Sequence, residues 1–447
     1  MRTEPTGNRR PLWGVLGAVV VLAVAGAAVY RIGPWSTASA AEPSVPRPMG
    51  PPVSVSGRSV SVLGAGDILL HPDLWNQARR DGGGTMDFAP MLAGVKAAVS
   101  AADLALCHLE TPLAAPDGPF IGFPKFSVPP QVVPAIKAIG YDGCSTASNH
   151  SIDQGYEGIK RSLDAFDQAG LGHSGTYRSA DEAKKPKIYD VKGVKVAHLS
   201  YAKSFNGLSR PAGQDWVANL IEPKKIETDA AAARTAGAEI VVVSLHWGTE
   251  YEHEPDVEQQ TWARAVVALP NVDVVLGHHA HVVQPVEKQS GKWIVYGLGN
   301  QIARHEEPVN QNRDGAMVRV TFTPAGTAKR WKVAAVEAIP TWVDLNPDIR
   351  VVDLERALAD PGVPAGRRRI YEAAVDRIQG HLLTRGAGTD GLVVRAAVTQ
   401  AAGPGPSSGP PPASTPGSAP STRRSRTASP RGSGRRWYSR RDLEAIR

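Results

Sequence analysis

Side chains of the types that bind divalent metal ions follow the strand-like runs of this sequence, close to where each run ends. The stretch LGHHAHVVQP, residues 276–285, alone holds three of the chain's 12 histidines. Carboxylate, amide and imidazole groups without thiolates suit Mn, Fe, Zn or Mg rather than a structural zinc site. In chain order these residues are Asp67, His71, His108, Glu110, Asn149, His150, His246, Glu250, His278, His279, His281 and Asn300.

Taken singly, each of these residues has an ordinary structural explanation. Asp67 could cap a helix, Asn149 could lie in a turn, and His246 could be a hydrogen-bonded histidine of the core. Taken together they favour a functional site, because loops rarely carry such residues at five consecutive strand ends. Functional sites in α/β proteins also lie at the carboxyl ends of the strands. Residues two apart on an extended segment point the same way, so His279 and His281 can face one pocket.

The elements that must position these residues alternate along the chain. Short apolar runs such as IVVVSLHW (240–247) and VDVVLGHH (272–279) are separated by amphipathic stretches such as GIKRSLDAFDQAG (158–170). This alternation predicts an α/β domain whose strands are buried on both faces. We expect that domain at residues 59–325, followed at 326–400 by an α+β extension whose clearest helix is 367–383.

The two ends of the chain differ from this pattern. The run from Leu12 to Tyr30 is uncharged and follows three arginines, so residues 1–32 predict a membrane anchor or a cleaved signal. Its length favours a single-pass transmembrane helix in the cell membrane, and both alternatives place the main domain outside the cytoplasm. Residues 33–58 are rich in Pro and Ser and predict a linker. Residues 401–447 predict a disordered basic tail rich in Pro, Ser and Arg.

Charge and cysteine content exclude several classes of protein. The tail carries nine Arg against Asp442 and Glu444, so its net charge is +7, the same as that of the whole chain. The charges of the remaining residues therefore balance, and nucleic acid is not an expected partner. The two cysteines, Cys107 and Cys144, cannot staple a small scaffold or form a cysteine-based zinc site. One bridge is possible after export, but both lie in apolar segments, and we expect buried free thiols.

The order of the motifs resembles the CapA-like poly-γ-glutamate capsule-synthesis family, a branch of the calcineurin-like metallophosphoesterase superfamily. The matching stretches run from about residue 60 to about residue 323. They are GDILLH, HLETPL, SNHSIDQG, KKPKIYDVKGVKVAHLSYA, HWGTEYEHEP, GHHAHVVQPVE and YGLGN. The resemblance implies a four-layered α/β sandwich with two divalent metal ions.

The resemblance also assigns roles. It makes Asp67 and His281 ligands of one metal ion, while Asn149, His246 and His279 hold the other and Glu110 bridges the two. His150 matches the histidine that protonates the leaving group or steadies the transition state. Four further residues are candidates to bind metal or to support a ligand: His71, Glu250, His278 and Asn300.

Three departures from the family pattern weaken one metal site. Position 69 is Leu where the superfamily has His, Glu110 replaces a bridging Asp, and position 108 is His where this branch commonly has Asn. The resemblance implies an extracytoplasmic, membrane-tethered hydrolase that acts on an anionic surface polymer. The alternative is a non-catalytic export or tethering subunit. In both cases the expected partners are the membrane, the polymer and the capsule synthase or export subunits.

Overall fold

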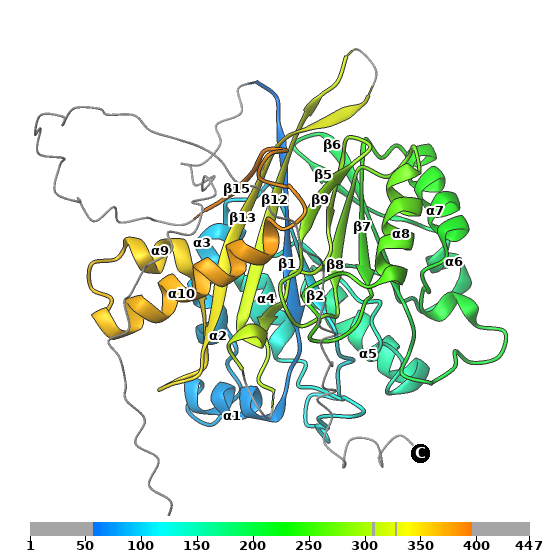
Figure 1. Cartoon of the computed structure of the whole chain (residues 1–447). Helices are drawn as coiled ribbons and strands as arrows, with labels where there is room; N and C mark the ends of the chain where they lie inside the picture. Colours follow the sequence, from blue (N-terminus) through cyan, green and yellow to red (C-terminus); the bar gives the residue numbers. More distant parts are fainter. Residues whose placement is uncertain (1–56, 306–308, 327–328, 396–447) are drawn as a thin grey trace, which may run out of the picture.

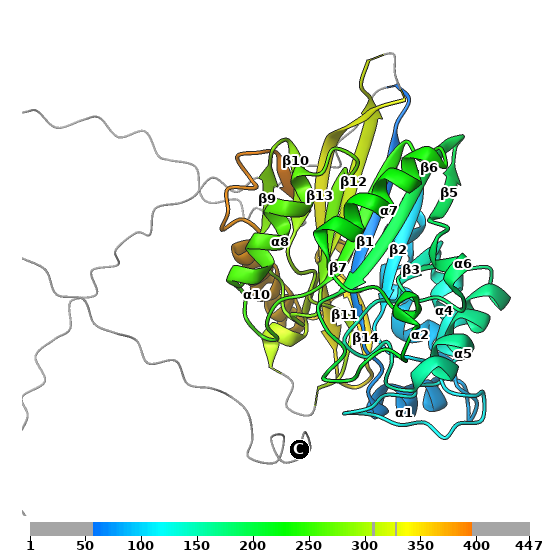
Figure 2. The same ribbon diagram turned by 90° about the vertical axis from the view of Figure 1, so that its right-hand side faces the viewer.

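The computed structural model describes residues 57–305, 309–326 and 329–395, which form two β-sheets packed face to face with helices on their outer faces (Figures 1 and 2). The order of layers is therefore helices, sheet, sheet, helices, and the predicted α/β class is confirmed. No helix within the described residues is both long and apolar enough to cross a membrane. The run 12–30, most of the linker 33–58 and the tail 401–447 lie outside those residues.

The first sheet has the strand order β14-β13-β12-β1-β2-β3-β4, with β11 beside β1 and β15 beside β13. Strands β1 to β4 are parallel, and so are the pairs β1–β11 and β13–β15. The pairs β1–β12, β12–β13 and β13–β14 are antiparallel. Its strands are β1 (Val60–Ile68), β2 (Leu104–Leu109), β3 (Gly143–Ser145), β4 (Gly172–Ser174), β11 (Asn300–Ile302), β12 (Asp314–Pro324), β13 (Trp331–Asp344), β14 (Arg350–Asp353) and β15 (Leu392–Val394).

The second sheet has the order β5-β6-β7-β8-β10-β9, and its four inner strands are parallel. Strand β7 reads IVVVSLH and every residue of it is buried, as expected of a parallel strand that is covered on both faces. The strands are β5 (Lys187–Val191), β6 (Val194–Ala202), β7 (Ile240–His246), β8 (Val274–His278), β9 (Val286–Gln289) and β10 (Lys292–Val295).

Helices cover the outer faces. The first sheet packs against α1 (Pro72–Asp81), α2 (Ala89–Leu92), α3 (Lys96–Ser100) and α4 (Val132–Ile139). The second packs against α7 (Pro223–Thr235) and α8 (Val257–Ala268), on the right of Figure 1. Helix α8 starts with a capping box between Asp256 and Gln259, which fixes the loop after β7. The remaining helices are α5 (Gly155–Gln168) and α6 (Ala180–Ala183), with α9 and α10 in the C-terminal segment.

The C-terminal segment is built into the first sheet. Strand β13 pairs with β12 along its length, and α9 (Leu354–Ala359) and α10 (Ala365–Leu382) join the core that lies between the sheets. Helix α10 corresponds to the helix predicted at 367–383. The segment 331–394 thus shares a sheet and a core with the residues before it.

The prediction of free thiols was wrong. Cys107 on β2 and Cys144 on β3 are register partners on adjacent strands, with their Cα atoms 4.4 Å apart, and they form a disulfide. The sequence alone does not show that these two strands pair.

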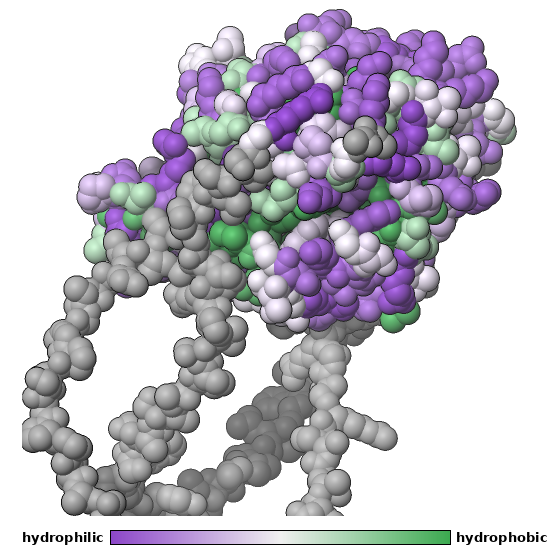
Figure 3. Space-filling model, turned by 90° about the horizontal axis from the view of Figure 1, so that it is seen from above, coloured by the Kyte–Doolittle hydropathy of each residue, from purple (hydrophilic) through white to green (hydrophobic). Residues whose placement is uncertain are grey.

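The parallel strands of both sheets bring their carboxyl ends together. Strand β1 begins at one end of the molecule and runs toward α1 at the other (Figure 1). The end where β1 begins, seen from above in Figure 3, is covered mostly by hydrophilic residues. The candidate metal ligands all lie toward the opposite end.

Candidate metal centre

The strand ends bring the six predicted metal ligands together. Two sets of side chains form candidate metal-binding groups, and within each set the ligand atoms lie within 4.8 Å of one another. One set is Asp67, Glu110 and His281, and the other is Glu110, His246 and His279. Asn149 joins the second set, since its Oδ1 lies 2.9 Å from His246 Nε2. Glu110 belongs to both sets, which is the position of a bridging carboxylate.

The loop after β8 holds its histidines in unusual backbone conformations. His279 has φ +91° and His281 has φ +55°, which non-glycine residues rarely adopt. Asp67 Oδ2 accepts a hydrogen bond from the backbone N–H of His279 at 3.0 Å, so it ties the end of β1 to this loop. Strained backbone conformations of this kind occur mainly at functional sites, where the surrounding structure holds them in place.

Glu110 is the clearest indication that a cation belongs here. It is 1% exposed, and neither carboxylate oxygen has a hydrogen-bond partner among the described residues. Burial raises the pKa of Glu110 well above its usual range, and the nearby Asp67 and Glu250 carboxylates add to the effect although His281 opposes it. A buried carboxylate without partners is costly, so the donor set fits divalent ions, which would satisfy those oxygens.

Two imidazoles beside Glu110, those of His246 and His279, are suited to bind metal, whereas the nearby carboxylates favour the charged form of His281. Burial lowers the pKa of His279 to about 4 and also lowers that of His246, which keeps both rings neutral with a free lone pair. Burial would lower the pKa of His281 too, but the Glu110 and Asp67 carboxylates raise it to about 10. Burial opposes the ionisation of Asp67, but the His278 and His281 imidazoles at 3.2 and 3.3 Å hold its pKa well below the usual range.

His246 is oriented by a residue that the sequence analysis treated only as a departure. His108 Nε2 lies 2.9 Å from His246 Nδ1, and His108 Nδ1 lies 2.8 Å from Ser145 Oγ. If His246 Nε2 binds metal, its Nδ1–H donates to His108 Nε2, and His108 Nδ1–H donates to Ser145. This chain fixes the tautomer of both rings, as partners of metal-binding histidines commonly do.

Asn300 supports His281 in the same way. Its Oδ1 lies 3.0 Å from His281 Nδ1, which leaves His281 Nε2 directed toward Glu110 Oε1 at 3.7 Å. Asn300 Nδ2 in turn donates to the carbonyl of Asn312 at 2.9 Å. Asn300 therefore positions a candidate ligand from the far side of the ring.

His150 lies beside the cluster in a fixed orientation. Its Nδ1 is 2.7 Å from Asp153 Oδ2, and its ring packs edge-on against Phe126 at a centroid distance of 4.8 Å. Asp153 Oδ2 also accepts the backbone N–H of Phe126 at 2.8 Å. With Nδ1 held by Asp153, His150 Nε2 is the nitrogen available to a substrate.

The other predicted candidates lie around this core. Glu250 forms a set with His279 and His281, and His278 forms one with Asp67 and His108. His71 belongs to none of these sets; its Nδ1 accepts the backbone N–H of Arg304 at 3.2 Å.

A residue that the sequence did not single out completes the rim of the site. His305 has ring contacts with His71 at 5.0 Å and with His281 at 5.2 Å. Its Nδ1 lies 3.3 Å from the Tyr251 hydroxyl, and Tyr251 is 45% exposed. The Tyr251 ring centroid also lies 6.0 Å from the His281 ring centroid, so an exposed aromatic ring borders the candidate metal centre.

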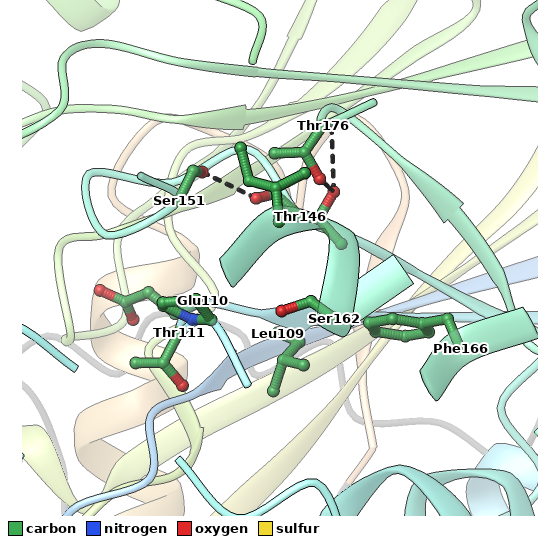
Figure 4. A pocket seen from close by; sticks show the side chains of 10 residues that line it. Leu109, Glu110, Thr111, Thr146, Ser151, Ser162, Phe166 and Thr176 are labelled. Carbon is green, nitrogen blue, oxygen red and sulfur yellow. Dashed lines mark hydrogen bonds between the residues drawn. The ribbon is translucent and has the colours of Figure 1, made fainter. Parts of the chain in front are cut away.

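The opposite side of Glu110 is closed. A cavity of about 20 Å³ lies behind it, lined by Thr111, Thr146, Ser162 and Phe166 among others (Figure 4). This is room for about one water molecule and far too little for a substrate. In Figure 4 the Glu110 side chain points away from Ser162 and Phe166.

Comparison with known families identifies relatives in capsule synthesis. The sequence profile described as "Bacterial capsule synthesis protein PGA_cap" matches residues 61–305. The chain is 31% identical over 208 residues to "PGA biosynthesis protein CapA" of Bacillus subtilis, covering 46% of this chain and 53% of that one. It is 28% identical over 219 residues to a "probable polyglutamine synthesis accessory protein" of Mycobacterium tuberculosis, covering 46% and 57%. The chain therefore spans about half the length of these curated relatives.

Solved structures are similar at a lower level. The calcineurin-like phosphoesterase YfkN of Bacillus subtilis has a TM-score of 0.42 and 11% identity, covering 72% of this chain and 98% of that one. A putative 5'-nucleotidase of Staphylococcus aureus has a TM-score of 0.41 and 13% identity, covering 71% and 58%.

Proposed function

Because the chain belongs to the bacterial capsule synthesis protein family PGA_cap, we propose that it is a metal-dependent hydrolase acting on an anionic cell-surface polymer. The observation that carries the proposal is the position of Glu110 in two sets of metal-binding side chains, buried and with both oxygens unpartnered among the described residues. A site built only to stabilise the fold would satisfy these oxygens with protein donors.

The residues would divide between two metal positions. Asp67, Glu110 and His281 would hold one ion, and Glu110, Asn149, His246 and His279 the other. Two bound divalent ions supply an activated water and polarise the scissile group. Since Leu69 is buried in the hydrophobic core, the first position has fewer protein ligands than the second.

The remaining chemistry belongs to His150 and the rim. His150 would hold a proton at Nε2 and deliver it to the leaving group, with Asp153 stabilising its charged form. Tyr251, His71 and His305 would contact the substrate beside the metal centre. Their polar edges and ring faces suit an extended chain rather than a small, enclosed ligand.

Turnover by the metal-reconstituted protein tests this proposal. We expect hydrolysis of bis(p-nitrophenyl) phosphate or of a γ-glutamyl oligomer that depends on Mn²⁺ or Zn²⁺ and stops with EDTA. A protein that binds metal but hydrolyses neither substrate would favour the non-catalytic export or tethering role.

We also propose that residues 12–30 tether the protein to the outer face of the cell membrane. Three arginines precede this uncharged run, and a charge excess on that side keeps the N-terminus in the cytoplasm. A C-terminal tag should fractionate with membranes and be removed by protease added to intact cells. A soluble protein whose N-terminus lies near Ala41 would show a cleaved signal instead, and a tag protected inside the cell would overturn the location.

A further inference from the structure

A second concave surface lies beside α10, outside the residues that match the family. It is a groove of about 330 Å³ between α10 and η3 (Asn310–Asn312), within the size range of ligand sites. Its lining includes Asn310, Arg313, Arg369, Ile370, Ala373 and Arg377. No part of the proposed hydrolytic chemistry uses them.

The groove carries more positive than negative charge. Arg313 and Arg377 lie over the same Trp342 ring, 3.9 and 5.6 Å from its centroid. Asp314 accepts hydrogen bonds from Arg377 at 2.8 and 2.9 Å, which occupies that carboxylate. The exposed Arg369 has no partner among the described residues. At least one guanidinium in the groove is therefore available to an external anion.

An apolar surface lies among these arginines. Ile370 is 50% exposed, and Ala373 is on the same exposed face of α10 one turn further along. Large apolar side chains exposed beside binding groups often contact a ligand. The groove thus offers the guanidinium of Arg369 for an anion, with an aliphatic surface beside it. Arg313 and Arg377 add positive charge, although they already bond the Val343 carbonyl and Asp314.

One short turn of chain joins the groove to the metal centre. Asn310 and Arg313 at the two ends of η3 line the groove, while the carbonyl of Asn312 accepts a hydrogen bond from Asn300. Asn300 in turn holds His281 at 3.0 Å. A chain lying in the groove would be held next to the segment that supports a candidate metal ligand.

We propose that this groove binds γ-linked polyglutamate, a chain whose carboxylates are separated by methylene groups. Arginine forks match carboxylates in bidentate geometry, and Ile370 and Ala373 contact the methylenes. The inference rests on the proposed function and extends it, because the groove would hold the polymer beside the metal centre while the centre performs the reaction.

Binding to the full-length protein tests the groove separately from turnover. The probe is a fluorescent poly-γ-glutamate oligomer of roughly ten residues, followed by anisotropy with EDTA present so that metal ions contribute nothing. Arg369→Glu should weaken binding by roughly tenfold or more, because it replaces an attractive charge with a repulsive one. Ile370→Glu should act in the same direction from the neighbouring, half-exposed position.

The matched control is Arg264→Glu on α8. It makes the same charge change at an exposed position of a helix that packs on the second sheet and does not line the groove, and it should bind like the wild type. The inference is overturned if Arg369→Glu also binds like the wild type, or if Arg264→Glu weakens binding equally. It is likewise overturned if a glycerol-phosphate polymer binds and poly-γ-glutamate does not. Absence of phosphodiester turnover would instead count against the hydrolase alone.

Discussion

His108 Nε2 lies 2.9 Å from His246 Nδ1, so a residue of β2 in the first sheet sets the orientation of a candidate metal ligand at the end of β7 in the second. The contact crosses the interface between the sheets. Both rings are buried, and burial lowers the pKa of each, which keeps them neutral and able to form a directed chain of hydrogen bonds to Ser145.

Replacing His108 should therefore weaken metal binding without removing a ligand of either proposed metal position. We expect His108→Ala to lower the affinity for Co²⁺ by roughly 10- to 100-fold, the usual cost of losing a residue that orients a metal ligand. Titration followed by the Co²⁺ absorption spectrum measures it. His108→Asn, which keeps a side-chain acceptor, should recover part of the loss.

His198 provides the matched control for His108. It is a buried histidine of β6 whose Nε2 bonds Ser244 at 2.9 Å, and it belongs to none of the metal-binding sets. His198→Ala should lower the melting temperature and leave the Co²⁺ affinity within about twofold of the wild type. Equal losses of affinity in the two variants would reduce the role of His108 to packing.

His150→Ala should retain metal and lose hydrolysis by a factor of roughly 10² to 10⁴, the range expected for a positioned proton donor. Asp153→Asn should lower turnover less, because the amide oxygen can still accept the hydrogen bond from Nδ1 but carries no negative charge. Steady-state kinetics with metal content measured on the same samples checks both. Unchanged turnover in His150→Ala would remove this residue from the reaction.

A pH-dependent contribution to stability is expected where α10 meets the loop after β7. His381 stacks on His253 with ring centroids 3.5 Å apart, and burial lowers the pKa of His381 from 6.5 to about 4, with His253 and Arg377 adding to the shift. The unfolded chain therefore binds this proton more readily. The stabilisation is complete above pH 6.5 and is lost as the pH falls toward 4.

Because His381 is partly exposed, the expected effect is about 1 kcal/mol. Urea unfolding in EDTA at pH 7.5 and 5.0 should show that His381→Gln loses less stability on acidification than the wild type. Parallel losses in the two proteins would mean that this ring does not sense pH.

Much of the site could be predicted because its residues follow strands in the sequence. Asp67, Glu110 and His246 stand directly at or after the ends of β1, β2 and β7, and parallel strands bring such ends together. The α/β class followed from the same alternation of runs. The strained His-x-His loop was visible as a cluster of histidines, although its backbone conformation was not.

Contacts between distant segments could not be predicted. The Cys107–Cys144 pairing depends on the register of β2 against β3, and the role of His108 depends on how one sheet faces the other. His305 reaches the rim through contacts with His71 and Tyr251, which are far away in the sequence. Neither spacing nor residue type indicates such neighbours before the chain is folded.

The most direct test of the metal centre is the metal content of the full-length protein after reconstitution with Mn²⁺ or Zn²⁺ and dialysis. Elemental analysis should find between about one and two equivalents per chain in the wild type. Glu110→Gln should hold clearly less, because Glu110 belongs to both ligand sets. Less than about half an equivalent of either metal in the wild type, or the same content in Glu110→Gln, would contradict a centre bridged by Glu110.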